Sequence, residues 1–200
     1  MDYISESDIR KIIAAVIEAS EKQTTGTVPL APVTSDKEAS GCAGSAGVHF
    51  IVAIGSDHGG YELKSNLIPY IQELGHEVLD CGTQSKESVD YPDFALAVAE
   101  LVQQKKACRG IVIDAAGIGS AIAANKVPGV RAAMCYDYAT ARNSREHNHA
   151  NVLSLGAGLL GLNQVKLIVK TWLETEAGGD RHARRIEKIT AIEKKYSKEI

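Results

Sequence analysis

Short apolar segments alternate with amphipathic segments along the chain from residue 49 onward. Strands that alternate with helices at this spacing are typical of βαβ units, which build a parallel sheet with helices on both faces. We therefore predict an α/β fold, doubly wound around a five-stranded, Rossmann-like parallel sheet. The predicted strands are 50–54, 77–80, 110–114, 130–135 and 152–155, and the predicted helices are 61–74, 93–105, 118–125, 138–145, 163–175 and 181–196.

The first 48 residues differ in composition from the rest of the chain. Within residues 1–20, Ile and Val recur with helical spacing, which predicts a short amphipathic helix with one apolar stripe. Residues 21–48 are rich in Thr, Ser, Gly, Ala and Pro, and we predict a flexible linker there, before a domain at 49–200. The helix either folds back onto the domain or its dimer, or docks on a partner protein. The stripe consists of Ile9, Ile12, Ile13, Val16 and Ile17.

Charge and hydropathy exclude several classes of protein. The formal net charge is −3, so no basic surplus is available to bind nucleic-acid phosphates. No apolar run approaches the roughly 18 to 20 residues of a membrane helix, and the acidic N-terminus is unlike a secretory signal. The cysteines include no C-x-x-C pair, so no zinc site is expected. These features predict a cytoplasmic protein that binds neither nucleic acid nor a membrane.

The fold itself predicts where a ligand would bind. In a doubly wound sheet, ligands bind beyond the carboxyl ends of the strands, where the strand order reverses. The predicted strand ends place Asp57, His58 and Asp114 there. The small-residue loop Gly117–Ser120 starts a helix, and its backbone N–H groups suit an anion or an enediolate oxygen. The alternative is that this loop is only a tight turn.

A second set of polar residues lies toward the end of the chain. His147 and Asn148 follow a predicted helix, and a single histidine is more often structural than catalytic. Arg181 and Arg185 are four residues apart on a predicted helix, so their guanidinium groups share one face and can bind a phosphate. The alternative is a solvated basic face.

Five motifs occur in order between about residues 50 and 195: Ser56-Asp57-His58-Gly59-Gly60, Val89-Asp90-Tyr91-Pro92, Gly117-x-Gly119 with Ala123-Ala124-Asn125-Lys126, Ser144-Arg145-Glu146-His147-Asn148, and Gly179-Asp180-Arg181-His182-x-x-Arg185. Together they resemble ribose-5-phosphate isomerase type B, a family that includes the galactose-6-phosphate isomerase subunits. The resemblance implies interconversion of an aldose phosphate and a ketose phosphate through a cis-enediolate, with no metal or cofactor. The implied pair is ribose 5-phosphate and ribulose 5-phosphate, or a close analogue.

The resemblance also implies roles for individual residues. Asp57 would contact sugar oxygens, and His147 would open the furanose ring. Family sites combine residues of two subunits, which implies a homodimer or a dimer of dimers with shared active sites. The residues implied to bind substrate are His58, Tyr91, Gly117, Gly119, Ser120, Asn125, Asn148, Arg181 and Arg185, of which the two arginines would hold the phosphate.

Three positions depart from the family pattern. Asp114 stands where many members carry a catalytic cysteine base, Ala116 stands for a Thr or Ser, and Gly158 stands for a phosphate-binding arginine. Asp114 is the only ionisable side chain at its strand end, so it is the predicted base, and apolar neighbours are expected to raise its basicity. The alternative is that it caps the following helix. Arg142 is a candidate replacement for the missing arginine.

These departures leave two functions open. The first is an active sugar-phosphate isomerase in which Asp114 is the base. The second is a non-catalytic homologue that binds a sugar phosphate or has a structural role, including that of a subunit which needs a partner chain.

The N-terminal extension has a resemblance of its own. A short helix with an Ile/Val stripe, joined by a linker to an enzyme domain, is similar to the encapsulation peptides of bacterial microcompartment cargo. The resemblance implies that residues 5–20 bind a shell protein. The enzyme would then lie in the lumen of a microcompartment.

Overall fold

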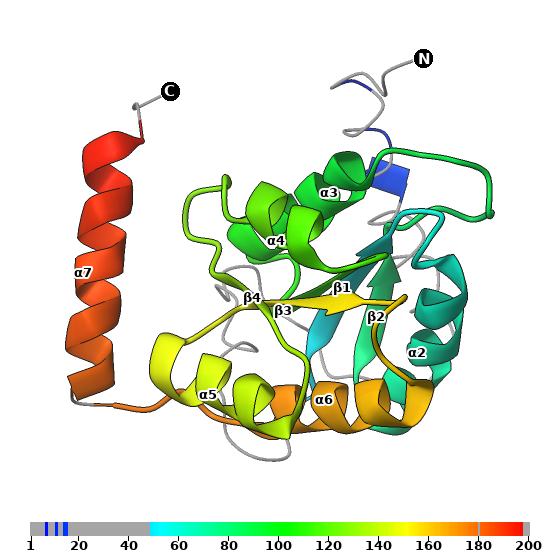
Figure 1. Cartoon of the computed structure of the whole chain (residues 1–200). Coiled ribbons are helices and arrows are strands. Elements are labelled where there is room, and N and C mark those ends of the chain that lie inside the picture. The colour runs from blue at the N-terminus through cyan, green and yellow to red at the C-terminus, as the bar shows by residue number, and fades with distance from the viewer. Residues whose placement is uncertain (1–6, 8–10, 12–13, 16–48, 180, 198–200) are drawn as a thin grey trace, which may run out of the picture.

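A parallel sheet forms the centre of the computed structural model, which describes residues 7, 11, 14–15, 49–179 and 181–197 (Figure 1). The strand order is β2-β1-β3-β5-β4, and all neighbouring strands are parallel. The predicted doubly wound α/β fold is therefore confirmed. The strands are β1 (Ile51–Ser56), β2 (Glu77–Asp80), β3 (Arg109–Asp114), β4 (Ala132–Met134) and β5 (Val152–Gly156).

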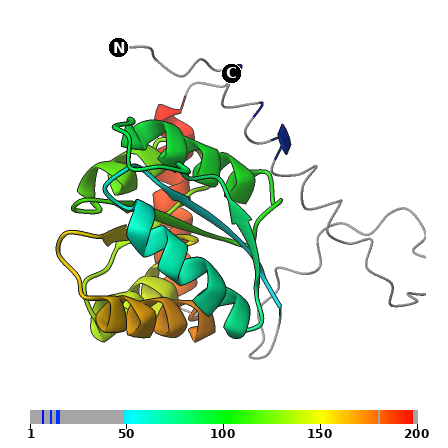
Figure 2. The ribbon, with the colours of Figure 1, turned by 90° about the vertical axis from the view of Figure 1, so that its right-hand side faces the viewer.

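Helices cover both faces of this sheet. Two apolar cores, one on each face, place α2, α5 and α6 on one side and α3 and α4 on the other (Figures 1 and 2). The central strands β3 and β5 are buried along their whole length because both faces are covered. The helices are α2 (Tyr61–Glu73), α3 (Tyr91–Gln103), α4 (Ile118–Ala124), α5 (Tyr138–Asn148), α6 (Leu162–Glu174) and α7 (Arg181–Tyr196).

Two elements differ by three residues in length from their predictions. The strand predicted over 130–135 is reduced to β4, an edge strand whose residues are only partly buried. Helix α5 extends three residues beyond its predicted end at 145, and it stops where His149 adopts a left-handed conformation with φ 48°. Asp137 and Thr140 begin this helix with a reciprocal capping box. The differences therefore lie at element ends, which sequence patterns define least well.

The reversal of strand order lies between β1 and β3. β1 pairs with β2 on one side and with β3 on the other, and the helices that follow β1 and β3 pack on opposite faces. The loops after these two strands therefore diverge and leave a crevice at the carboxyl edge of the sheet. Gly117 makes the turn into α4 with φ 79°, and an added Cβ would lie 2.9 Å from the Leu155 carbonyl carbon.

Helix α7 stands at the side of the domain (Figure 1). Its first two turns bury His182 and Ile186, and Glu193 accepts a hydrogen bond from the Gly129 N–H at 2.9 Å. Its other large apolar residues, Ile189, Ile192 and Tyr196, are exposed. Among the described residues, no helix combines the length and apolar character required to span a bilayer.

The predicted N-terminal helix and linker fall almost wholly outside the described part of the chain. Ser7, Lys11, Ala14 and Ala15 are described, and they are helical and exposed. The apolar stripe that was the basis of the helix prediction is not among them, so the division into 1–20, 21–48 and 49–200 stays a prediction.

Candidate active site

The carboxyl edge of the sheet gathers the first set of predicted site residues, which we call the carboxyl-edge group: Asp57, His58, Tyr91, Asp114, Gly117, Gly119 and Ser120. The Asp57 N–H donates to the Ile113 carbonyl at 3.3 Å, which places Asp57 beside the end of β3. The Asp57 carboxylate accepts the Gly60 N–H at 3.0 Å and so orients the start of α2. Two carboxylates, Asp57 and Asp114, therefore lie at neighbouring strand ends across the crevice.

Asp114 is held by backbone N–H groups of the loop that follows it. Its Oδ1 accepts from Ala116 at 2.8 Å and from Gly117, and its Oδ2 accepts from Ser120 at 2.9 Å. The residue is only 5% exposed. Burial by itself raises the pKa of Asp114, but the hydrogen bonds from Ser120, Gly117 and Ala116 outweigh burial, and the pKa lies below its usual value.

This geometry changes two expectations for Asp114. The predicted rise in basicity is not observed, because hydrogen bonds to the charged form dominate over the apolar neighbours. Two candidate donors for an enediolate oxygen, the N–H groups of Gly117 and Ser120, donate to Asp114 itself. The Asp114 carboxylate thus occupies the position predicted for a bound anion, at the N–H groups of the loop that follows it; we call this position the anion cradle.

Other members of the carboxyl-edge group shape the crevice. The Tyr91 side chain lies against Gly119, where an added Cβ would come within 2.5 Å of the Tyr91 Cζ atom. His58 is exposed, and its Nδ1 lies 3.2 Å from the backbone N and O of Val89. His58 therefore contacts the segment that leads into α3, and Gly119 is required for Tyr91 to approach the loop.

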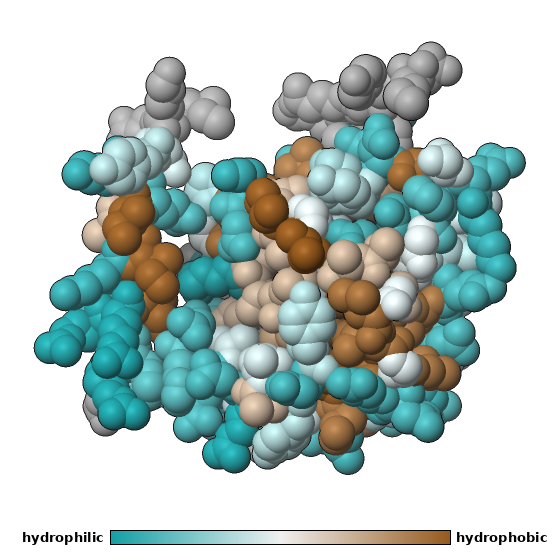
Figure 3. Space-filling model, in the orientation of Figure 1, coloured by the Kyte–Doolittle hydropathy of each residue, from teal (hydrophilic) through white to brown (hydrophobic). Residues whose placement is uncertain are grey.

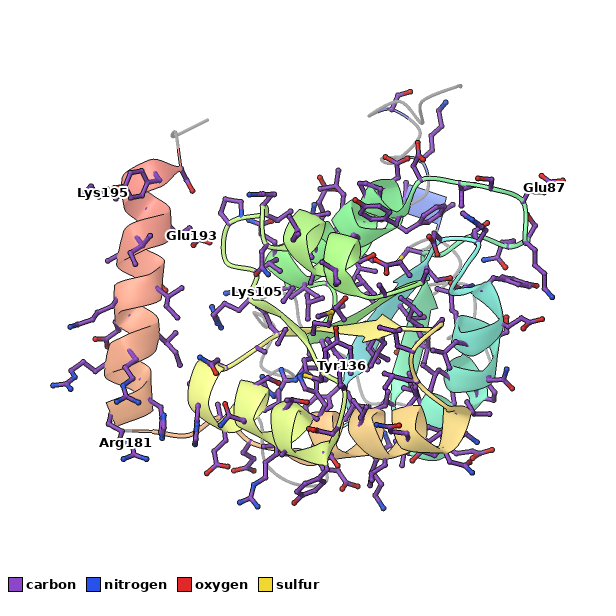
Figure 4. The ribbon with its side chains drawn as sticks, viewed as in Figure 1. Glu87, Lys105, Tyr136, Arg181, Glu193 and Lys195 are labelled. Carbon is purple, nitrogen blue, oxygen red and sulfur yellow. The ribbon has the colours of Figure 1, made fainter. Side chains whose placement is uncertain are left out.

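The second set of predicted site residues lies at the opposite end of the strands, and we call it the amino-edge group: His147, Asn148, Arg181 and Arg185. Helix α5 runs antiparallel to the strands, so its last residues reach the edge where β4 and β5 begin. Arg131, at that edge, donates to the Asn148 carbonyl at 3.2 Å. The Gly178 N–H donates to the Glu146 carbonyl at 2.8 Å and brings the start of α7 to the same place. Figure 4 shows Arg181 at the end of α7 nearest α5.

The His147 ring has two close neighbours that the sequence patterns did not assign to the site. It stacks on the His182 ring with centroids 4.2 Å apart and planes 5° from parallel. Its Nδ1 lies 2.8 Å from the side-chain amide nitrogen of Asn143. Burial, His147 and the two arginines Arg181 and Arg185 lower the pKa of His182. Two features of the sequence could have identified these neighbours. His182 lies within the R-H-x-x-R motif, and Asn143 lies four residues before His147 on the same helix.

One chain does not bring the two groups together. A strand rises about 3.3 Å per residue, so the ends of β5 are roughly 13 Å apart, and the two groups lie at opposite edges. Asn125 also lies away from the crevice, at the end of α4. Its side chain accepts the Ala132 N–H at 2.8 Å and donates to the Ala132 carbonyl at 2.9 Å. In this chain Asn125 therefore ties α4 to β4.

The candidate replacement for the missing arginine is engaged elsewhere. The Arg142 Nε donates to the Glu146 carboxylate at 3.1 Å along the surface of α5. Gly158 lies at the carboxyl edge, where its N–H donates to the Ala115 carbonyl at 2.9 Å. Among the described residues, no group of His, Cys, Asp or Glu side chains has the arrangement to hold a metal ion.

Comparisons with known proteins agree with the fold and the motifs. Residues 52–189 match the family model described as ribose/galactose isomerase. Ribose-5-phosphate isomerase B of Escherichia coli K12 is 44% identical over 144 residues, which cover 72% of this chain and 97% of that protein.

Solved structures extend the same comparison. The structure of Clostridium thermocellum ribose-5-phosphate isomerase B is 55% identical with a TM-score of 0.73, and the match covers 74% of this chain and 99% of that one. The Mycoplasma genitalium ribose-5-phosphate isomerase B with bound ribulose 5-phosphate is 38% identical with a TM-score of 0.70, over 72% of this chain and 96% of that one. The family match spans more than half of the sequence and includes both edge groups. The chain belongs to the ribose/galactose isomerase family and is a sugar-phosphate isomerase of the ribose-5-phosphate isomerase B type.

Proposed function

We propose that this protein interconverts ribose 5-phosphate and ribulose 5-phosphate, or a close analogue, at sites shared between two copies of the chain. The observation that carries the proposal is the separation of the two groups. The two carboxylates Asp57 and Asp114 lie at the carboxyl edge, whereas His147 and the two arginines lie at the amino edge. A pair of copies that places one edge against the other completes two equivalent sites, because a two-fold axis applies every contact twice.

Charge and hydropathy support such a pair. The carboxyl-edge group carries carboxylates, and the amino-edge group carries Arg181 and Arg185, which are both exposed. Large apolar side chains are also exposed on the domain and on α7, and Figure 3 shows brown surface over α4, around the start of α6 and along α7. Exposed apolar surface of this kind is typical of a protein interface. These residues include Ile118, Ile122, Leu159, Leu162, Ile189, Ile192 and Tyr196.

In the proposed reaction, His147 opens the sugar ring. It gives a proton to the ring oxygen as the bond from that oxygen to C1 breaks, and the C1 hydroxyl proton returns to the histidine as the aldehyde forms. Arg181 and Arg185 hold the phosphate through charge-assisted hydrogen bonds. Asp57 contacts sugar hydroxyls and fixes the open chain in the crevice.

Asp114 then moves a proton between the two carbons. It takes the C2 proton, and the electron pair of that C–H bond forms the C1–C2 double bond of a cis-enediolate with negative charge on O1. The O2 proton passes to O1, and the proton on Asp114 is returned to C1, which leaves a ketone at C2. A carboxylate with a lowered pKa is a weak base for this step, so it must exchange some of its backbone hydrogen bonds as the substrate binds.

The backbone hydrogen bonds to Asp114 also support the second function, that of a non-catalytic homologue. A carboxylate that fills the anion cradle of its own loop stabilises that loop without any substrate. If Asp114 serves only this purpose, the protein binds a sugar phosphate and does not isomerise it. A coupled assay across pentose and hexose phosphates separates the two functions, because only the first predicts turnover.

Mixing of variants tests the shared site. Asp57→Asn and His147→Ala are each expected to be inactive as homodimers, since each loses one half of both sites. In a mixture refolded together, half of the dimers are mixed and each has one intact site, so about a quarter of the parent activity should return. If the mixture stays inactive although both variants dimerise, the shared site is wrong. If Asp57→Asn alone retains parent activity, the role of Asp57 is wrong.

We also propose that the enzyme is cargo of a bacterial microcompartment. The support is the isoleucine and valine stripe within residues 5–20 and the linker that joins it to the enzyme domain. The stripe would dock on a shell protein and retain the enzyme in the lumen. Many copies in one compartment would raise a moderate affinity by avidity.

A further inference from the structure

His147 receives a hydrogen bond from its own helix. Asn143 lies one turn before it on α5, and the Asn143 Nδ2 atom is 2.8 Å from the His147 Nδ1 atom. An amide NH2 group can only donate, so His147 Nδ1 must accept. In the neutral ring, the proton then lies on Nε2, the nitrogen on the far side of the imidazole.

A second contact fixes the plane of the same ring. The His182 ring of α7 lies parallel to it, with centroids 4.2 Å apart. The Arg181 Nε lies 3.3 Å from the His182 Nε2 and donates to it, so this nitrogen of His182 acts as an acceptor. The His182 Nδ1 atom is buried without a hydrogen-bond partner, and the residue is 9% exposed. His182 is therefore a neutral ring, and it also lies close to Gly178, where an added Cβ would come within 3.3 Å of the His182 Cδ2 atom.

We propose that Asn143 is a positioning residue that fixes His147 in the Nε2–H tautomer, with the stacked His182 ring holding the ring plane. The proposal rests on the proposed function, in which His147 gives a proton to the ring oxygen. Only a protonated nitrogen that points away from α5 can serve as that donor. Asn143 would thus set which nitrogen reacts without touching the substrate.

The charged groups around His147 do not set its tautomer in the way that Asn143 does. Glu146 and Arg142 on α5 are bonded to each other, with Nε and Oε2 3.1 Å apart. On α7, Arg181 donates to His182, and Arg185 is exposed. The His147 Nδ1 atom contacts the Asn143 amide, which makes Asn143 the residue to vary.

Nitrogen-detected NMR of histidine side chains tests the proposal on the full-length protein without substrate. The two tautomers of a neutral imidazole have different nitrogen shifts, and His147→Gln identifies the His147 signals by their loss. We expect the parent protein to show His147 as the Nε2–H tautomer. An Nδ1–H tautomer in the parent protein would overturn the proposal.

Two variants with opposite chemistry sharpen the test. Asn143→Leu removes the donor and should give a mixture of tautomers, whereas Asn143→Asp offers an acceptor and should move the proton to Nδ1. Asn66→Leu is the matched control, because Asn66 is also an exposed helical asparagine and its amide donates to the Glu62 carbonyl at 2.7 Å within α2. It should leave the His147 signals unchanged. An unchanged tautomer in both Asn143 variants would overturn the proposal, and the parent spectrum still decides if a variant does not fold.

Kinetics provide a readout that a merely structural role would not move. An aldotetrose 4-phosphate cannot form a furanose ring, because its C4 oxygen carries the phosphate. Asn143→Asp should therefore lose at least about tenfold more kcat/KM with ribose 5-phosphate than with erythrose 4-phosphate. Equal losses with the two aldoses would contradict the role in ring opening. If the parent turns over neither sugar, the proposed function fails, whereas the NMR result still decides the tautomer.

Discussion

Substitution of Asp114 by Asn directly tests the loop that follows β3, whose backbone N–H groups bind the Asp114 carboxylate. Asp114→Asn keeps one acceptor oxygen in place of two, so it can retain the bonds from Ala116 and Gly117 but not the bond from Ser120. The new NH2 group would instead face the Ser120 N–H, which leaves a buried donor without a partner. A donor orphaned in this way costs about 1 to 3 kcal/mol. Because Asp114 is only 5% exposed, water compensates little of this cost.

The expected result is a less stable but folded protein. For a chain of this size, 1 kcal/mol corresponds to a shift in Tm of roughly 2 to 4 °C, and urea unfolding at neutral pH measures the free energy directly. Asp114→Ala, which orphans all three donors, should lose more than Asp114→Asn. Equal stability of the parent and Asp114→Asn would show that the carboxylate is not held by the loop.

The pH dependence gives an independent check on the same residue. The folded-state pKa of Asp114 is lowered, so its ionised form stabilises the fold above the unfolded pKa of about 3.9. That contribution is lost as pH falls through the folded pKa. The stability gap between parent and Asp114→Asn should therefore stay constant near neutral pH and narrow in acid.

Turnover separates the two functions of Asp114. If it is the base, Asp114→Asn lowers kcat by several orders of magnitude, far beyond the effect of a loss of 1 to 3 kcal/mol of stability on the folded fraction. Near-normal turnover by a folded Asp114→Asn would show that the base lies elsewhere. The stability and turnover results are thus independent of each other.

Three further predictions concern other parts of the molecule. Replacement of Arg181 or Arg185 by Ala should weaken sugar-phosphate binding about tenfold to a hundredfold, and an unchanged affinity of the double variant in calorimetry would place the phosphate site elsewhere. Lys64→Met should cost about 1 to 3 kcal/mol in urea unfolding, because the 2% exposed Lys64 side chain is bonded to Asp80 at 2.5 Å, whereas Asp80 is 26% exposed and keeps its hydrogen bonds from Gly82 and Gln84; an unchanged free energy would show that this ion pair is dispensable. Residues 1–22 fused to a fluorescent protein should enter shells and Ile13→Asp should abolish this, whereas uniform fluorescence of the unmutated fusion in shell-forming cells would refute the docking role.

The sequence predicted the fold well because its signals are local. The helices and strands follow from apolar periodicity, and the position of Asp57 and Asp114 at one crevice follows from the order of strands in this fold class. The bonding of Asp114 could not be predicted, because it depends on loop dihedral angles such as the left-handed φ of Gly117. The apolar neighbours of Asp114 were visible in the sequence, but the three backbone donors that lower its pKa were not.

The separation of the two groups is a property that the topology itself imposes. In a parallel sheet with antiparallel helices, a residue at the carboxyl end of any strand and a residue at the end of any connecting helix lie at opposite edges. Asp114 ends a strand, whereas His147 lies near the end of a helix. We therefore expect that a chemistry which needs both residues uses a second copy of the chain, as proposed above. The order of the motifs along the sequence is thus itself an argument for a shared site, and it depends on the fold class more than on any single contact.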